Sequence, residues 1–473
     1  MTRFVSQSVG ASGLFILIGA AGLLQGLAQP GALDPSFTPG QGLTQPASGA
    51  HVAVAKIQPD GRILLAGSFS QFDGVPRPYL VRLQTNGLLD PEFDGHLSGA
   101  VLGVLALGLQ PDGKTLVGGD FIYVGGLSHP YLVRLHADGS KDSGFAWVPL
   151  QSRVRAIECQ PDGRIIIAGD FGALNGAGRN IARLTTNGVP DNSFTAVVGP
   201  AGGGSGTDPV TGLARQADGR LLISGDFQLV NGQPRVRVAR LFSDGSLDES
   251  FSPGAGPNGW VYRMLVQPDG KIVIAGLFNT VGTTPRPGIA RLLPNGSLDA
   301  SFGSNLEPTN AVIYALARQP DGKLLVGGAF SGVDGHPVPG LARLSADGSL
   351  DGSFLADAAI RSASAMALQP DGRIVVGGFS LPSAFQSTGG IYRVLGGPYE
   401  FRFIALRPLP DGHVALDTIG EPDRRFVLEA TADLVRWRIL GTNDAPTVCH
   451  SLVDESSPAA PFRFYRGYLL SSP

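Results

Sequence analysis

The chain has 473 residues and a formal net charge of −3, and only 16% of its residues are charged. A chain of this length can bury a core without disulfide or metal staples. The small net charge gives no reason to expect nucleic acid or an acidic membrane surface as a partner. Its 68 glycines are about twice the usual share, which favours a turn-rich, all-β protein.

The first residues have the pattern of a secretory signal peptide. Arg3 precedes an apolar run from Leu14 to Leu24, and Gly26-Leu27-Ala28 supplies small residues where a signal peptidase cleaves. We predict that residues 1–28 are a signal peptide and that the mature chain is secreted or held in the cell envelope. The run is shorter than the roughly 20 residues that span a bilayer, so no transmembrane segment is expected after cleavage. An uncleaved anchor is the alternative.

A turn motif recurs through most of the chain. Its first copy reads Gln58-Pro59-Asp60-Gly61-Arg62 and continues as an apolar run to Phe69. The seven copies start at Gln58, Gln110, Gln160, Gln216, Gln267, Gln319 and Gln369, which are 50 to 56 residues apart by subtraction. A period near fifty residues indicates a repeat architecture in which each unit packs on its neighbours.

Each copy predicts four antiparallel strands. In the first copy, residues 51–58 and 62–69 flank one tight turn, and residues 79–83 and 88–93 flank a second turn at Asn86-Gly87. Four antiparallel strands per unit form the blade of a β-propeller.

The ends of the repeat region predict a closed ring. A fourth-strand motif at residues 33–37 precedes the first hairpin, whereas the last copy ends at residues 391–395 without one. We predict that the N-terminal strand completes the seventh blade, which removes exposed sheet edges. The fold class is therefore all-β, with a seven-bladed propeller over residues 29–397.

The first strands support a crowded central axis. Four residues before each repeated glutamine stand small side chains, and Arg263 is the exception among Val54, Ala106, Ala156, Gly212, Arg263, Ala315 and Ala365. Cys159 takes the place of residues such as Ile57 and Leu109, so we interpret it as a strand filler. A bridge to Cys449, the other cysteine, is possible in principle but not expected.

The repeats resemble a known family. The pattern Gln-Pro-Asp-Gly-Lys/Arg, an apolar run, Gly-Gly-x-Phe and then Leu-Asp-x-Ser-Phe is similar to the uncharacterised bacterial delta-60 repeat. The resemblance covers roughly residues 33–397, with departures such as Ala217 in place of the turn proline. It implies a propeller in an exported protein, and it implies no chemistry.

The repeat pattern stops near Pro398. Short strands are expected at residues 401–406, 413–418, 426–430, 435–440 and 462–469, which predicts a small β-sandwich-like module over residues 398–473. Residues 426–434 with Trp437, and then 463–466, resemble a C-terminal module of many exported bacterial proteins. Its role is either packing or attachment.

Arginines of the third strands and aspartates of the fourth predict one ion pair per blade. The pairs are Arg82 with Asp90, Arg134 with Asp142, Arg183 with Asp191, Arg240 with Asp248, Arg291 with Asp299, Arg343 with Asp351, and Arg393 with Asp34 across the closure. Because the pair repeats in every blade, we interpret it as structural. A ring of binding charges is the alternative.

Two further sets are candidate ligand-binding residues. A basic rim consists of one residue before the third strand in six copies, namely Arg77, His129, Arg179, Arg235, Arg286 and His336. Such a rim suits carboxylated or sulfated glycans, although the same residues can instead satisfy loop carbonyls. Aromatic candidates on the connecting loops are Trp147, Trp260 and Tyr262, and burial between blades is their alternative role.

The sequence carries no recognisable catalytic or metal motif. We find no zinc-ligand spacing, no Gly-x-Ser-x-Gly elbow and no calcium-loop run, so no catalytic residue, metal or cofactor is predicted. The leading hypothesis is a monomeric, non-enzymatic exported propeller that binds a protein or glycan partner. The alternatives are a polysaccharide-active enzyme with its site at the central channel, or a purely structural envelope component.

Overall fold

The computed structural model describes residues 3–6, 15–18, 29–45, 50–174, 179–199, 208–378 and 390–397, followed by residues 402–408, 413–419, 426–431, 438–443, 449–454 and 464–469. The regular elements in these ranges are β-strands. None of these residues belongs to a helix long and apolar enough to cross a membrane. The predicted cleavage site at Ala28 lies outside the described residues.

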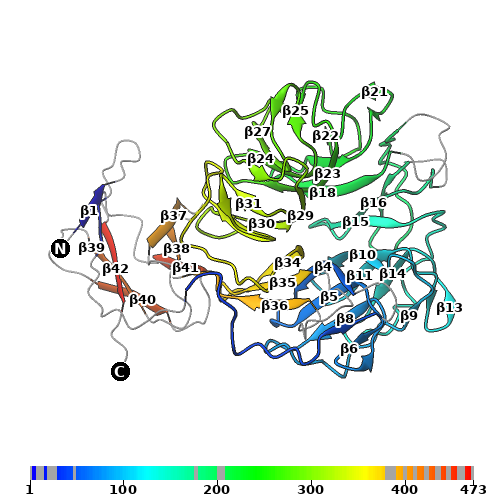
Figure 1. The fold of residues 1–473 in the computed structure, drawn as a ribbon, viewed down its shortest axis with the longest axis horizontal. Coiled ribbons are helices and arrows are strands. Elements are labelled where there is room, and N and C mark those ends of the chain that lie inside the picture. The colour runs from blue at the N-terminus through cyan, green and yellow to red at the C-terminus, as the bar shows by residue number, and fades with distance from the viewer. Residues whose placement is uncertain are drawn as a thin grey trace.

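Each of the seven repeats forms one antiparallel sheet of three strands (Figure 1). The sheets consist of β4 (His51–Ile57), β5 (Ile63–Ser68) and β8 (Leu80–Leu83); β10 (Val104–Leu109), β11 (Thr115–Gly119) and β14 (Leu132–Leu135); β15 (Val154–Cys159), β16 (Ile165–Gly169) and β17 (Ile181–Leu184); β18 (Val210–Arg215), β19 (Leu221–Gly225) and β22 (Val238–Leu241); β23 (Trp260–Val266), β24 (Ile272–Leu277) and β27 (Ile289–Leu292); β29 (Val312–Arg318), β30 (Leu324–Ala329) and β33 (Leu341–Leu344); and β34 (Ala363–Leu368), β35 (Ile374–Gly378) and β36 (Ile391–Val394). The sheets are arranged as in a β-propeller, and the first strand of the last sheet, β34, contacts that of the first, β4.

The prediction of a fourth strand in each unit is wrong. Where it was expected, a single bridge joins the chain to the third strand, as between Leu83 and Leu89 and between Leu33 and Val394. The cause is the aspartate that follows, because its side chain accepts the backbone N–H two residues on, as Asp248 does from Ser250 at 3.0 Å. This Asx turn bends the chain away before a ladder can continue.

The core lies between neighbouring sheets. The second strand of each sheet is buried on both faces, so its near-continuous apolar run packs against the sheet before it and the sheet after it. The cluster at the junction of the two ends contains Leu65 and Val81 from the first sheet and Val375 and Ile391 from the last. Cys159 is a free, half-buried cysteine that packs in such a cluster.

Every first strand carries a β-bulge at the same position. The register shifts between Val52 and Val54 in the first sheet, and between the corresponding residues of the other six. The glycine that pairs with the residue before the bulge has no room for a side chain, because a Cβ on Gly276 would overlap the Trp260 carbonyl. The same overlap occurs at Gly67, Gly119, Gly169, Gly225, Gly328 and Gly378. This contact explains why each second strand has a glycine as its last or next-to-last residue.

We expect Gly276→Ala to destabilise the protein by at least about 3 kcal/mol, because the added methyl group meets a backbone carbonyl that cannot rotate away. Gly352→Ala is the matched control, since no atom lies within 4 Å of its Cβ position. Urea unfolding of both variants measures the difference. Equal stability of the two variants would contradict this account of the bulge.

In the part of the chain that the structure describes, short hairpins lie between the second and third strands of five repeats. They are formed by β6 (Gln71–Phe72) and β7 (Val75–Pro76), β12 (Tyr123–Val124) and β13 (Leu127–Ser128), β20 (Leu229–Val230) and β21 (Gln233–Pro234), β25 (Thr280–Val281) and β26 (Thr284–Pro285), and β31 (Gly332–Val333) and β32 (His336–Pro337). Three of these hairpins gain a third strand from the preceding connection, namely β3 (Leu43–Thr44), β9 (Leu97–Ser98) and β28 (Leu306–Glu307).

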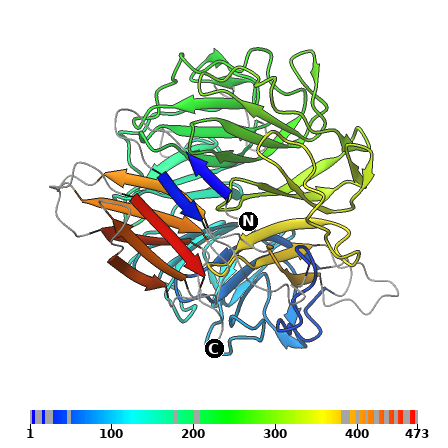
Figure 2. The same ribbon diagram turned by 90° about the vertical axis from the view of Figure 1, so that its left-hand side faces the viewer.

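The remaining strands form two further sheets to one side of the repeats (Figure 1). One contains β37 (Arg402–Pro408), β38 (Val414–Ile419) and β41 (Cys449–Asp454), and the other contains β1 (Arg3–Ser6), β2 (Phe15–Ile18), β42 (Phe464–Leu469), β39 (Phe426–Thr431) and β40 (Arg438–Asn443). Figure 2 shows the two N-terminal strands in blue beside β42 in red, to which β2 is parallel. Strand β41 was not expected from the sequence.

Candidate functional site

The structure brings together all seven arginine and aspartate pairs that the sequence singles out. The distances from arginine Nε to aspartate Oδ2 are 2.7 Å for Arg82 and Asp90, 2.8 Å for Arg134 and Asp142, 2.8 Å for Arg183 and Asp191, 2.7 Å for Arg240 and Asp248, 2.8 Å for Arg291 and Asp299, 2.7 Å for Arg343 and Asp351, and 2.8 Å for Arg393 and Asp34. The last pair joins residues that are 359 positions apart.

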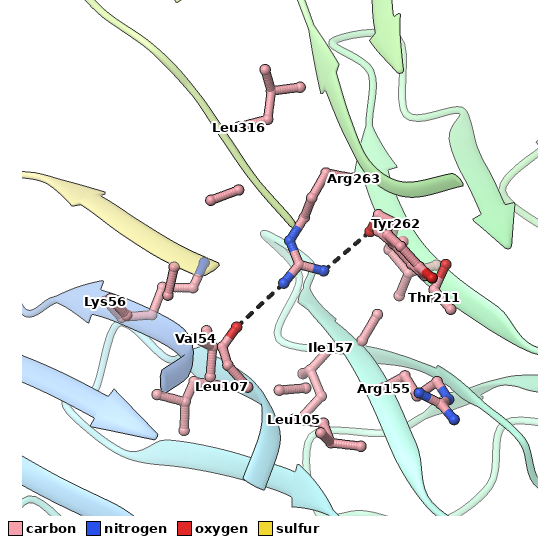
Figure 3. Close-up of a pocket in the computed structure, with 18 of the residues that line it drawn as sticks. Val54, Lys56, Leu105, Leu107, Arg155, Ile157, Thr211, Tyr262, Arg263 and Leu316 are labelled. Atoms are coloured by element: carbon pink, nitrogen blue, oxygen red, sulfur yellow. Dashed lines mark hydrogen bonds between the residues drawn. The ribbon is translucent and has the colours of Figure 1, made fainter. Parts of the chain in front are cut away.

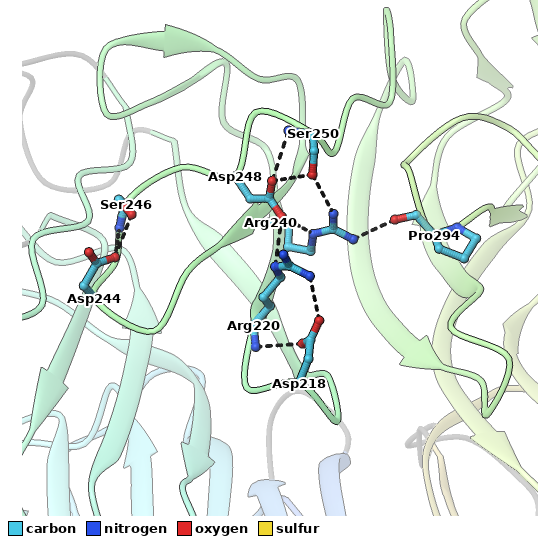
Figure 4. Close-up of polar contacts among 8 residues, drawn as sticks. All are labelled: Asp218, Arg220, Arg240, Asp244, Ser246, Asp248, Ser250 and Pro294. Carbon is cyan, nitrogen blue, oxygen red and sulfur yellow. Dashed lines mark hydrogen bonds and ion pairs between the residues drawn. The ribbon is translucent and has the colours of Figure 1, made fainter.

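Each arginine also connects its sheet to the next one (Figure 4). Arg240 donates from Nη1 to the Pro294 carbonyl of the following repeat at 2.6 Å and from Nη2 to Ser250 Oγ at 3.2 Å. Its guanidinium lies over the Phe251 ring, 4.9 Å from the centroid. A second cation, Arg220, lies 3.2 Å from Asp248. The buried charges are thus paired and hydrogen-bonded, as burial requires.

We expect Arg240→Lys to lower the free energy of unfolding by about 2–3 kcal/mol, because an ammonium group cannot make all of these contacts at once. Arg235→Lys is the control, since within the described residues this arginine bonds only the neighbouring Pro234 carbonyl, at 2.7 Å, and does not link two sheets. Its effect should stay within about 0.5 kcal/mol. Chemical denaturation measures both variants, and similar losses would contradict the proposed link between sheets.

The same aspartates should make the protein sensitive to acid. Burial raises the pKa of Asp142, but the Gly144 N–H, Lys114 and Arg134 outweigh it and lower the pKa to about 2. The pKa values of Asp34, Asp191, Asp248, Asp299 and Asp351 are lowered too. Because the unfolded-state pKa is about 3.9, this stability is present above about pH 4 and is lost as the pH falls towards 2. Melting temperatures measured from pH 2 to 7 should fall as the pH is lowered below about 4. The fall should be smaller in Asp142→Asn.

The residues of the predicted basic rim lie in their own loops, mostly half-buried. Arg77, Arg235 and Arg286 each donate from Nη1 to the carbonyl of the preceding proline, at 2.9, 2.7 and 2.9 Å. Arg179 is buried, and His129 contacts Lys141, while burial and that lysine lower the pKa of His129. Only His336 among the six is exposed. These contacts correspond to the alternative in which the residues satisfy loop carbonyls.

Two of the three aromatic candidates come together. The rings of Trp260 and Tyr262 are 5.9 Å apart, and Tyr262 stacks on Tyr314 at 6.0 Å. Burial raises the pKa of both tyrosines. Trp147 is separate in sequence and is 58% exposed between β14 and β15. Tyr314 was missed, although it occupies the same place in its repeat as Tyr262, five residues before the repeated glutamine.

A cavity of about 230 Å³ lies where the first strands converge, and all seven of them line it (Figure 3). The bulged residues differ between repeats: Ala53, Leu105, Arg155, Thr211 and Tyr262 line the cavity, whereas Tyr314 and Ser364 are not part of its lining. Two of them bond the next sheet: Thr211 Oγ1 donates to the Val261 carbonyl and Ser364 Oγ to the Val52 carbonyl, both at 2.6 Å.

The charged residues that line the cavity are Lys56, Arg155 and Arg263, and no carboxylate of the described chain lines it. The positive charge of Arg155 is compensated, because its Nη2 donates to the buried carboxylate of Asp170 at 2.8 Å. Arg153 also lies 2.9 Å from this carboxylate. Arg263 instead donates to two carbonyls, of Tyr262 at 3.1 Å and of Ala53 at 3.3 Å. The cavity is therefore electropositive and suited to an anion.

The described residues contain no group of three or more histidine, cysteine, aspartate or glutamate side chains that could hold a metal ion. His51 lies near Arg263, and burial together with the arginine's charge lowers its pKa to about 4. Burial, and then the charge of Glu158, raise the pKa of the Cys159 thiol to about 11, which makes it a poor nucleophile. The cavity and the side chains that line it can bind and orient a ligand.

The repeats match a family of β-propeller domains. Six segments, at residues 58–93, 110–145, 160–194, 216–251, 267–302 and 319–354, match the family described as "Domain of unknown function (DUF5122) beta-propeller". The copy that starts at Gln369 lies outside these ranges. These matches support a repeat of the β-propeller type in this part of the chain. A comparison with curated proteins gives no significant match.

The chain also shows a distant similarity to solved structures. The extracellular domain of a B. thetaiotaomicron protein assigned as a hybrid two-component system has 12% identity and a TM-score of 0.48, over 84% of this chain and 46% of that one. The chain thus spans less than half of that structure. The WD40 β-propeller domain of Doa1 has 13% identity and a TM-score of 0.43, over 77% of this chain and 95% of that one. YCF48 from Cyanidioschyzon merolae has 11% identity and a TM-score of 0.43, over 75% and 98%.

Proposed function

We propose that the protein is an exported, seven-bladed β-propeller that binds a glycan or another macromolecule at one mouth of its central channel. The resemblance to bacterial delta-60 repeats and the signal-peptide pattern of residues 1–28 support export. The strands of residues 398–473 serve as an accessory module in this proposal.

The ring of seven blades is supported by three contacts. First strands from all seven repeats line one cavity, β34 packs beside β4, and Leu33 bridges Val394. Closure packs the first and last sheets against each other, so neither sheet is left with an uncovered apolar face. It also provides a rigid frame on which variable residues can form a site.

The observation that carries the binding role is the aromatic row of Trp260, Tyr262 and Tyr314. The three side chains are half-buried at the start of β23 and β29, and Tyr262 lines the cavity. Flat aromatic surfaces that retain partial exposure beside a cavity are suited to stacking on a sugar ring or an aromatic ligand.

Binding is favoured over hydrolysis by the composition of the cavity. Glycoside cleavage generally requires two carboxyl groups about 5–10 Å apart across the scissile bond. The cavity lining within the described chain carries cations, alanines and aliphatic side chains instead. A polysaccharide-active enzyme would need its carboxylates elsewhere.

A glycan array with the full-length protein tests the proposal. We expect a defined set of bound glycans, and Trp260→Ala or Tyr314→Ala should weaken binding by about tenfold, or about 1.4 kcal/mol, through loss of stacking. Arg286→Ala is the matched control in the rim, because its Nη1 already bonds the Pro285 carbonyl. Loss of anionic glycans in Arg286→Ala alone would move the site to the rim. Absence of any ligand would favour a purely structural role, and release of sugar would favour the enzyme.

A further inference from the structure

One residue departs from the small side chains that follow the bulge in the other repeats. In six repeats the position after the bulge holds valine, alanine or glycine, whereas β23 places Arg263 there. Its small counterparts leave the space that forms the cavity. Residues that break the local sequence pattern of a fold without improving its packing are concentrated at functional sites.

Arg263 is only partly satisfied by the protein. Figure 3 shows its side chain reaching from β23 towards β4, where it donates to the Ala53 carbonyl at 3.3 Å in addition to the Tyr262 carbonyl at 3.1 Å. Both acceptors are neutral, and together they use two of the five N–H donors of a guanidinium group. The side chain remains partly accessible from the cavity although it lies deep in the molecule.

No carboxylate of the described chain lies within ion-pair distance of Arg263. The titratable neighbours do not supply the missing charge: His51 has a pKa lowered to about 4, and Arg155 is itself bound to Asp170. Lys56 adds positive charge to the lining, and Glu158, on β15, interacts with Lys56 and Arg215. Burial of an unpaired charge is costly, and an anion in the cavity would offset that cost.

The cavity limits the size of such an anion. Its volume of about 230 Å³ lies below the roughly 300–1,000 Å³ of pockets for drug-sized ligands. A planar guanidinium group matches the two oxygens of a carboxylate better than an ammonium group does. Tyr262 lines the same cavity and continues into the aromatic row, so a ring attached to the carboxylate would lie beside aromatic faces.

We propose that the central cavity binds the carboxylate of a small organic acid, above all an acidic sugar, and that Arg263 is the residue that binds the anion. The identification of the ligand as an acidic sugar rests on the proposed glycan-binding function. The identification of a carboxylate site at Arg263 does not depend on that function. A glycan would present a terminal or side-chain uronic acid to the cavity while its neighbouring rings lie on the aromatic row.

Isothermal titration calorimetry with sodium glucuronate tests the site in the full-length protein. We expect one bound glucuronate per chain, weakened by added salt, and no binding of glucose at the same concentration. Arg263→Ala and Arg263→Met should weaken glucuronate at least tenfold, and Arg263→Lys should weaken it less. Arg164→Ala removes one charge at an exposed turn outside the cavity lining and should leave glucuronate binding unchanged. Sodium acetate and sodium sulfate as further ligands distinguish a general carboxylate or anion site from one that also requires the sugar.

The possible results separate this proposal from the simpler role of Arg263 as a strut between β23 and β4. Glucuronate binding that depends on Arg263, with melting temperatures of the variants equal to or above that of the wild type, supports the anion site. Absence of wild-type binding to glucuronate, acetate and sulfate overturns it, and so does unchanged binding in Arg263→Ala. If the alanine variant fails to fold, the proposal is still tested by whether the wild type binds glucuronate and whether Arg263→Lys weakens that binding. Neutral glycans bound on the array through Trp260, without glucuronate binding, would retain the proposed function and reject only the carboxylate site.

Discussion

The architecture depends on one arginine in each repeat that satisfies its hydrogen-bonding capacity on two sheets at once. Nε holds the aspartate of its own repeat, Nη1 reaches a carbonyl in the turn of the next repeat, and the guanidinium face covers a phenylalanine, as Arg240 shows. A buried charge is tolerated only when it is paired and bonded in this way. The requirement explains why arginine, aspartate and phenylalanine return in every copy with the same spacing. These three residues are therefore repeated because they stabilise the fold.

The residues that differ most between repeats lie in the first strand of each sheet, at the edge opposite the third strand and near the central axis. The bulge takes one residue of each first strand out of the regular register, five of these seven residues line the cavity, and the glycine across from the bulge makes it possible. Because the backbone there is fixed by packing, the bulged residue can be arginine, threonine, tyrosine or alanine without loss of the fold. The chain thus combines a uniform outer frame with an individual inner surface, the arrangement in which rigid scaffolds usually carry binding residues.

Much of the frame could be predicted from the sequence because its signals are local. The Pro-Asp-Gly turns fix the first hairpins, and the constant spacing of Arg240 and Asp248 anticipates their contact. The fourth strand was predicted wrongly because a tight turn such as Asn86-Gly87 suggests that a paired strand follows, while the aspartate side chain terminates pairing at that point. The bulge is invisible in a hydrophobic pattern, since it shifts register by one residue without changing composition. Tyr314 was missed as a partner of Tyr262, although both stand five residues before the repeated glutamine. The bond from Arg286 to a loop carbonyl corresponds to the alternative that was weighed for the rim residues.

The contact between Asp34 and Arg393 has a consequence for the order in which the chain can fold. The two residues are 359 positions apart, and the bridge from Leu33 to Val394 and the shared cluster around Val375 form only when both are present. During synthesis or translocation, early repeats can stack on one another, but the segment around Asp34 must wait for the last sheet. Closing so long a loop costs entropy that nearest-neighbour packing does not, so ring closure should be the late, slow step of folding. Until then, the first and last sheets expose faces that require protection from other unfinished chains.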